Sequence, residues 1–353
     1  MTAASPFDQT AARGALLALA SALLFGASTP LVQYFGRGVD SFVTAVLLYA
    51  GAAFAGWLTR RPIEREARLR KTDLPRLILA SLFGAAVGPV ALAWGLQHAT
   101  ASAASLMLTL EAVFTAWLAR VFYGESMPAR VALAMLSISA GAALLLADRR
   151  SGANGADVFG LLAVLGATIA WGADNTLSRS LALRDPGQTV LAKAAIGTCA
   201  TIVIAVCTSA ATPPLRAAVG LVAVGAVGYG LSLRLYLLAQ RAFGAGRTAS
   251  VFAFAPFIGA LVAVALGERG VSIWLLGGAA LMLLGVVLHL LERHAHAHEH
   301  EPLEHEHAHT HDDGHHAHPH DPMPQGAHSH LHRHDAMTHV HAHVPDAHHT
   351  HRH

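Results

Sequence analysis

The amino-acid sequence predicts an all-α integral membrane protein in which ten transmembrane helices form two inverted five-helix repeats, followed by a disordered His-rich C-terminal tail. Three observations predict this fold class. The chain has 353 residues, of which 54% are hydrophobic and only 13% are charged, whereas about a quarter of the residues of a soluble domain are charged. Apolar segments recur along the chain, each close to the ~20 residues that cross about 30 Å of hydrocarbon as a helix. Histidines dominate the sequence after residue 293.

Short polar stretches separate the apolar segments and set their bounds. Both cysteines, Cys199 and Cys207, fall inside the seventh segment, so the sequence predicts no extracellular disulfide framework. The first segment is longer than the apolar core of a secretory signal and more spans follow it, so we expect it to stay in the protein. The predicted spans are 14–35, 40–59, 75–97, 102–123, 128–147, 158–180, 188–209, 216–240, 246–266 and 271–291.

Basic residues predict the orientation of these spans. If the N-terminus is cytoplasmic, fifteen Lys and Arg residues belong to the cytoplasmic side and five to the other side. Cytoplasmic loops carry the excess of basic residues, so we expect a multi-pass protein of the inner (plasma) membrane with both termini in the cytoplasm. A net charge of +2 gives no reason to expect nucleic acid as a partner. The expected partners are the lipid bilayer and divalent metal ions, and a homodimer is compatible with the sequence.

The two halves of the apolar region resemble each other. Residues 14–30 resemble residues 160–176, and residues 104–125 resemble residues 249–268. Because each repeat has five spans, an odd number, the second copy must be inverted relative to the first. Inverted repeats are typical of secondary transporters, which bind substrate near the midplane. The predicted organisation is an N-terminal cytoplasmic segment (1–13), a first repeat (14–147), a linker (148–157), a second repeat (158–292) and a tail (293–353).

Paired motifs extend this similarity to a known family. Gly124-Glu125 and Gly267-Glu268 end the fourth and ninth spans, and an aromatic-Gly pair occurs in spans one and six, as Phe25-Gly26 and Trp171-Gly172. With ten spans, residues 14–291 resemble the EamA-type permeases of the drug/metabolite transporter superfamily. The resemblance implies export of a small solute. It does not choose among amino acids, other metabolites, drugs and metals, because a fold does not determine a function.

The tail carries all but two of the 25 histidines, often on alternate residues. Imidazole suits zinc, copper, nickel and cobalt, and the acidic residues between the histidines attract cations. Five prolines argue against a regular helix there. An expression tag would place its histidines in one run, whereas these are spread over the whole tail. The predicted metal ligands are His294, His296, His298, His300, His305, His307, His309, His311, His315, His316, His318 and His320.

A permease of this kind with a long His-rich C-terminus resembles the cobalt and nickel resistance permeases. That resemblance makes nickel and cobalt the first ions to expect. The histidine spacing does not separate nickel, cobalt and zinc, because disordered ligands impose no geometry. The tail alternatively buffers, senses or delivers metal without sharing the substrate of the membrane part.

Few ionisable residues lie within the predicted spans, and each is a candidate for the transport pathway because a charge at the centre of a helix costs roughly 2.5–3.5 kcal/mol. Glu111 lies near the middle of span four. Three others lie at matched depth and are able to meet, so that Asp174 could form a structural ion pair with Lys193 or Arg234. Glu111 could bind a cation or proton with Asp174 across the repeat interface, or simply hydrogen-bond to Thr109 or Thr115. The predicted pathway residues are Glu111, Asp174, Asn175, Lys193, Arg234 and His98, the last at an outer boundary where histidines are commonly solvated.

Helix-breaking residues indicate the same region. Gly84, Gly88 and Pro89 interrupt span three, and Gly225, Gly228 and Gly230 interrupt the corresponding span eight. Corresponding interruptions mark the helices that bind substrate, although close helix packing through small residues explains them equally well. Pro30 and Pro256 are expected to kink spans one and nine.

These features predict a secondary-active efflux permease for divalent transition-metal ions, with the tail capturing metal in the cytoplasm. No phosphate-binding Gly-rich loop or enzyme site is visible, so we expect an ion gradient to drive transport, with no cofactor for transport itself. Acidic and basic residues balance within the membrane, which fits a zwitterion comfortably. Export of amino acids or related metabolites is therefore the alternative, and a membrane-anchored metal store or sensor is a third possibility.

Overall fold

The computed structural model describes residues 6–59, 67–124, 127–148, 156–179, 181, 184–243, 245–291, 295–300, 303–309, 328–334 and 337–342, and every structural statement below refers to them. Within this part of the chain, ten helical segments are long and apolar enough to cross a membrane. Their bounds agree with the predicted spans to within a few residues. The protein is therefore a multi-pass membrane protein, in contact with the lipid bilayer.

The first repeat contains five spans, two of which are broken. Asp40 begins the second span, because its carboxylate accepts hydrogen bonds from the amides of Phe42 and Val43. The elements are α1 (Pro6–Gly36), α2 (Ser41–Leu58), η2 (Lys71–Asp73), α3 (Leu74–Leu82), η3 (Phe83–Val87), α4 (Gly88–His98), α5 (Ala101–Met107), α6 (Leu110–Tyr123) and α7 (Ala129–Ala147).

The second repeat has the same plan. Its third span contains a π-helical segment, η6, and its fourth span is split into two helices, as in the first repeat. The elements are α8 (Ala156–Ser178), α9 (Pro186–Cys207), α10 (Leu215–Val224), η6 (Gly225–Leu231), α11 (Ser232–Phe243), α12 (Ala245–Phe252), α13 (Ala255–Ala265) and α14 (Ile273–Leu290).

The backbone conformation of Gly124 and Gly267 explains the paired Gly-Glu motifs. Gly124 and Gly267 adopt positive φ angles of 68° and 99°, which glycine reaches without steric penalty. Gly124 ends α6 in the left-handed conformation, and Gly267 lies just beyond α13. The repeated sequence signal therefore marks the ends of two equivalent helices.

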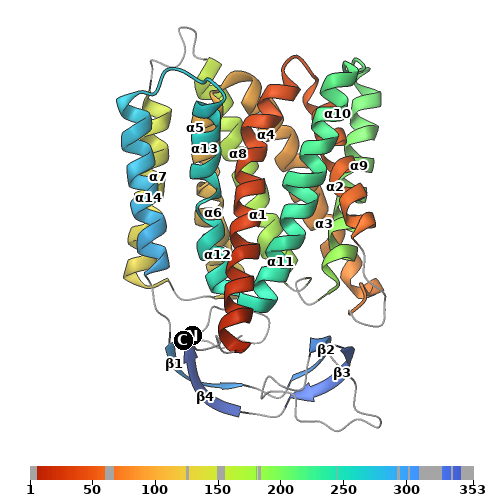
Figure 1. Ribbon diagram of the computed structural model, residues 1–353, viewed down its shortest axis with the longest axis vertical. Coiled ribbons are helices and arrows are strands. Elements are labelled where there is room, and N and C mark those ends of the chain that lie inside the picture. The colour runs from red at the N-terminus through yellow and green to blue at the C-terminus, as the bar shows by residue number, and fades with distance from the viewer. Residues whose placement is uncertain are drawn as a thin grey trace, which may run out of the picture.

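The helices of the two repeats are interleaved in one bundle (Figure 1). α1 packs on α11, and α8 packs on α4, so that the first span of each repeat contacts the third span of the other. α2 packs on α9, and α7 packs on α14, so that the second and fifth spans meet their own counterparts. Each contact between a span of the first repeat and a span of the second is therefore matched by the equivalent contact with the repeats exchanged, as an inverted repeat requires.

Glycines allow the closest of these approaches. A Cβ added at Gly225 would overlap the backbone of Leu48 on α2, and one added at Gly278 would lie 2.9 Å from the carbonyl oxygen of Gly141 on α7. Small residues at helix interfaces let backbones approach in membranes, where van der Waals packing replaces the hydrophobic effect as the driving force.

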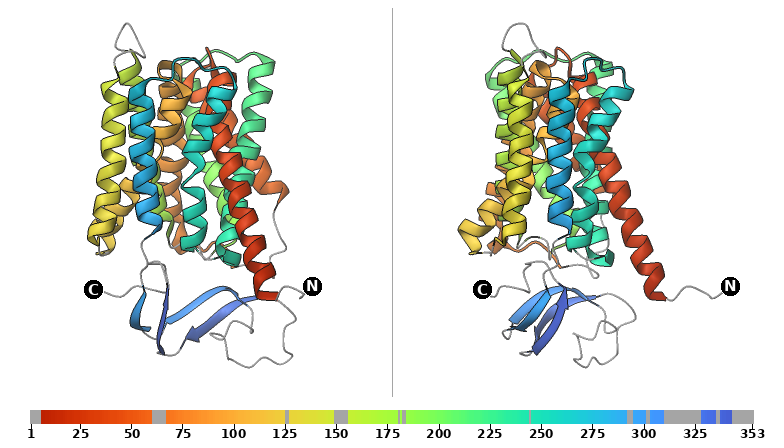
Figure 2. Two further views of the ribbon diagram at one scale, coloured as in Figure 1. Left: turned by 60° about the vertical axis from the view of Figure 1, so that its left-hand side comes forward. Right: turned by 90° about the vertical axis from the view of Figure 1, so that its left-hand side faces the viewer.

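The described parts of the tail form strands beside the bundle. β1 (Ala295–His300) pairs with β4 (Met337–Ala342), and β2 (Leu303–His309) pairs with β3 (His328–His334), both antiparallel. Irregular structure was expected here, but the alternation of histidine with a second residue type is also the period of a strand. The strands lie at the end of the bundle where α1 begins and α14 ends (Figures 1 and 2).

The packing at Gly225 gives a test of the interleaved bundle. We expect Gly225→Ala to lower thermal stability in detergent, with a destabilisation of about 1–3 kcal/mol, as is typical when a methyl group is forced into a filled site. The control is Gly166→Ala on α8, because a Cβ at Gly166 meets nothing within 4 Å. Equal melting temperatures for the two variants would contradict the packing.

Candidate functional site

One π-helical turn interrupts the third span of each repeat, at the positions that the sequence predicts. In η3 the amide of Gly88 bonds to the carbonyl of Phe83, five residues back, and η6 occupies the corresponding place in span eight. π-turns are frequent at functional sites because they widen the helix locally. The interruptions therefore place irregular backbone inside the bundle, where neighbouring side chains must satisfy it.

The carbonyl oxygen of Gly84 within η3 is satisfied by side chains of two other helices. The Tyr49 hydroxyl on α2 donates to it at 2.6 Å, and the Trp171 indole on α8 donates at 2.9 Å. Gly84 also lies against Asp174, because a Cβ at this position would overlap the carboxylate. The π-turn thus joins three spans from both repeats at one residue.

Asp174 and Lys193 form an ion pair between α8 and α9. The Lys193 ammonium lies 2.5 Å and 2.7 Å from the two carboxylate oxygens, and the Ser178 hydroxyl donates to Asp174 at 2.9 Å. The two side chains are only 14% and 11% exposed. Lys193 also donates to Ser178 at 3.1 Å. The charges are therefore paired and hydrogen-bonded, as a buried pair must be to offset its desolvation.

Glu111 lies at a break in the fourth span. α5 ends at Met107 and α6 begins at Leu110, so the carboxylate stands in the first turn of a half-helix, where the helix dipole favours negative charge. The amide nitrogen of Asn175 donates to Glu111 at 2.6 Å and lies 3.4 Å from the Thr115 hydroxyl. The hydrogen-bond partner of Glu111 is therefore a neutral amide.

The break recurs in the ninth span, between α12 and α13, with Pro256 at the start of α13. The kink expected at Pro256 is thus a complete interruption. The break beside Glu111 escapes sequence reasoning because no proline or glycine marks it. The alignment of the two repeats does contain a signal for this break, because Glu111 and the helix-breaking Pro256 occupy equivalent positions in the two matched segments.

Aromatic rings form a connected row from α2 to α11. Tyr49 and Tyr229 have ring centroids 5.7 Å apart, and Phe25 lies 5.8 Å from Tyr229 and 5.3 Å from Phe252. Tyr236 continues the row at 4.9 Å from Phe252. The sequence singled out only Phe25 among these five rings, as part of a family motif, because the rings come from four spans and their meeting depends on the packing of the repeats.

The other two predicted pathway residues are Arg234 and His98. Arg234 is half-buried on α11, and Lys193, not Arg234, pairs with Asp174. His98 is half-buried at the end of α4, where its ring stacks on Trp94 with centroids 4.0 Å apart and Nδ1 lies 2.8 Å from the Trp94 carbonyl oxygen. The structure brings Glu111 of the first repeat next to Asn175 of the second, and Asp174 next to Lys193 within the second repeat.

Part of the predicted metal site can be placed in the structure. His294, His311, His315, His316, His318 and His320 lie outside the described residues. His296, His298, His300, His305, His307 and His309 lie on β1 and β2. Among the side chains that the structure describes, no group of three or more His, Cys, Asp or Glu is arranged to hold a metal ion.

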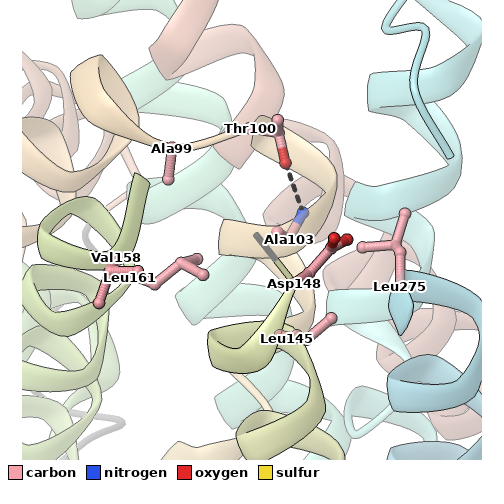
Figure 3. A pocket seen from close by; sticks show the side chains of 8 residues that line it. All are labelled: Ala99, Thr100, Ala103, Leu145, Asp148, Val158, Leu161 and Leu275. Atoms are coloured by element: carbon pink, nitrogen blue, oxygen red, sulfur yellow. Dashed lines mark hydrogen bonds between the residues drawn. The ribbon is translucent and has the colours of Figure 1, made fainter. Parts of the chain in front are cut away.

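At the end of the bundle where α14 begins, two carboxylates connect neighbouring helices. Glu268, just after α13, accepts hydrogen bonds from the amide and hydroxyl of Ser102 on α5, and Asp148 accepts one from the Ser272 hydroxyl at the start of α14. Figure 3 shows Asp148 beside a small cavity. Its volume of about 20 Å³ has room for about one water molecule, so this cavity is too small for a larger solute.

Comparison with known proteins decides the family. The model of the EamA-like transporter family matches residues 12–147 and 158–291, one match for each repeat. The chain belongs to the EamA-like transporter family. Members of this family are transporters, and the superfamily and two-repeat architecture predicted from the sequence are confirmed. The match says nothing about the tail, which lies beyond it.

Two curated relatives and one solved structure add detail. An uncharacterized transporter of Methanothermobacter thermautotrophicus is 28% identical over 63% of this chain, which spans 66% of that relative. A probable terminal-alkyne amino-acid exporter of Streptantibioticus cattleyicolor is 31% identical over 72% of this chain and 84% of its own length. A crystal structure superposes with a TM-score of 0.56 over 78% of this chain and 96% of its own, at 19% identity, which supports the fold alone.

The ion pair at η3 gives a second test. We expect Asp174→Asn and Lys193→Met each to destabilise the protein by about 3–5 kcal/mol, because each leaves a buried charge without its partner. The double variant should recover much of that loss. The measurement is the melting temperature of detergent-purified protein for the wild type, both singles and the double. Additive losses would contradict a direct pairing of the two charges.

Proposed function

We propose that the protein is a secondary-active efflux permease of the plasma membrane that exports divalent transition-metal ions, nickel or cobalt first. Both termini face the cytoplasm, and the His-rich tail captures metal there. The observation that supports this most directly is Glu111, a carboxylate at a helix break inside the membrane whose hydrogen-bond partner is neutral. An ionisable residue in this position is a candidate ion or proton site.

Glu111 offers one negative charge that binds either a proton or a divalent cation. Competition between the two at a single carboxylate couples the inward movement of protons to the outward movement of metal. The carbonyl oxygen of Asn175 and the hydroxyl of Thr115 are further oxygen ligands within reach of the same space. Water completes the coordination shell, which suits transient binding because a transported ion must also leave.

The Asp174–Lys193 pair positions the neighbouring Asn175 for this site. Asp174 precedes Asn175 on α8, and it fixes that turn of the helix against η3 and α9. Because the pair carries no net charge, it does not compete for the cation. Asn175 is thereby held toward Glu111, and Lys193 keeps a second carboxylate from trapping the metal in the pathway.

The tail supplies the second part of the proposal. Nitrogen ligands favour nickel, cobalt, copper and zinc over magnesium and calcium, and the tail strands concentrate them at the end of the bundle where α1 begins. Metal collected there raises the local supply to the membrane part. The preference for nickel and cobalt within this group comes from the resemblance to the resistance permeases.

Export through Glu111 can be tested in cells. We expect the full chain to lower cellular nickel and cobalt and to raise resistance to both ions. Glu111→Gln should abolish both effects, because it keeps an oxygen for Asn175 and removes the charge. Asp40→Asn is the control, since Asn caps a helix as well as Asp and Asp40 lies exposed at the start of α2. Metal content by mass spectrometry is the readout.

A chain truncated after Arg293 separates the roles of tail and membrane part. We expect it to export at high external metal and to lose protection at low metal. Retention of metal by the full chain, with Glu111→Gln unchanged, would contradict export and favour a metal store or sensor anchored in the membrane.

Export of an amino acid or related metabolite is the second candidate. It is supported by the name of the Streptantibioticus relative, and by the aromatic row that reaches from Tyr49 to Tyr236, since rings favour ammonium groups. The same strains distinguish it: amino acids released into the medium would depend on Glu111, while cellular nickel and cobalt would not change.

A further inference from the structure

The backbone register of the tail strands places histidine opposite histidine. In the ladder of β1 and β4, His296 is the partner of His341 and His298 is the partner of His339. In the ladder of β2 and β3 the same holds for three more pairs, which are His305 with His332, His307 with His330, and His309 with His328. A shift of one residue in either ladder would place histidine opposite a different residue type at each of these positions.

The register also separates histidines from acidic residues. Directly opposed residues lie on the same face of a ladder, and residues two apart along a strand share that face. All histidines of the four strands therefore fall on one face of their own ladder. Glu299, Glu304 and Glu306 occupy positions of the other face, opposite Thr338, Arg333 and Leu331 respectively. One face of each ladder therefore has histidine positions and no acidic residue.

We propose that the tail binds transition-metal ions as two separate antiparallel ribbons, with each ion held between histidines of both strands. The class of ligand follows from the face, since a nitrogen-only set suits nickel, cobalt, copper and zinc and excludes magnesium, calcium and manganese. This inference rests on the metal-capture part of the proposed function. It replaces a chain of independent histidines with two sites defined by strand register.

Metal and strand pairing support each other in this arrangement. An isolated two-stranded ribbon is marginally stable in water, and joining β1 to β4 closes a long segment at an entropic cost. A metal ion held between the strands contributes its binding free energy to the pairing, because the site is absent from the unpaired chain. Metal should therefore order the beginning and the end of the tail together.

The register can be tested with variants of identical composition. Shifting the histidines of β4 by one residue, with H339V, V340H, H341A and A342H, leaves their number and spacing unchanged and moves them to the other face. Shifting the two β1 histidines that pair with histidines of β4, with A295H, H296A, A297H and H298A, moves them to the other face in the same way, while His300 stays opposite Met337. The two shifts combined restore histidine opposite histidine, because residue 295 is the partner of 342 and residue 297 of 340.

Nickel binding is measured on the purified full-length protein by competition with a chromogenic chelator. Replacing residues that only orient a metal ligand costs ~10–100-fold in affinity, so we expect each single shift to weaken the β1–β4 site by at least about tenfold. The combined variant should return to the wild-type affinity. Equal affinities for all four proteins, or no recovery in the combined variant, would overturn the ribbon.

Hydrogen exchange of the tail amides gives an independent readout. We expect nickel to protect residues 295–300 and 337–342 together in the wild type and in the combined variant, and neither segment in the single shifts. Protection of one segment without the other would contradict the pairing. Because these measurements need no transport, they can fail while export through Glu111 stands, and they can succeed if export fails.

Discussion

The requirement that every backbone polar group be satisfied inside the membrane governs the rest of this structure. A straight helix meets the requirement by itself, but a π-turn does not, and η3 meets it with side chains from elsewhere. The Gly84 carbonyl accepts hydrogen bonds from Tyr49 and Trp171, and its missing Cβ leaves space for Asp174. Asp174 in turn requires Lys193. One interrupted turn therefore determines which residues of α2, α8 and α9 can meet.

The inverted repeat explains why the site is asymmetric although the fold is not. Both third spans contain a π-turn, and both fourth spans are broken at the same place. The first repeat has Glu111 at its break, whereas the second has Pro256, which cannot bind a proton or an ion. The breaks give each repeat a half-helix, and in the proposed function the single carboxylate makes the break of the first repeat the one that binds protons and cations. Such an arrangement suits alternating access around one site.

Much of the fold follows from the sequence because membrane spans have a strong signal in length and composition. The positions of the π-turns could also be predicted, since glycines cluster at 84 and 88 and again at 225, 228 and 230. The partners could not. Which of Lys193 and Arg234 pairs with Asp174 depends on rotations of α9 and α11 that hydropathy does not specify. The aromatic row and the bond from Asn175 to Glu111 depend in the same way on packing between repeats, as does the register of the tail strands.

Coupled movement of metal and protons is the central claim, and reconstituted protein tests it most directly. The protein would be placed in liposomes containing nickel, with a proton gradient imposed across the membrane and both fluxes followed by entrapped dyes. We expect nickel and protons to move in opposite directions, and both fluxes to vanish with Glu111→Gln. Nickel flux that does not depend on the proton gradient, or that persists in Glu111→Gln, would contradict the exchange of cation and proton at this carboxylate.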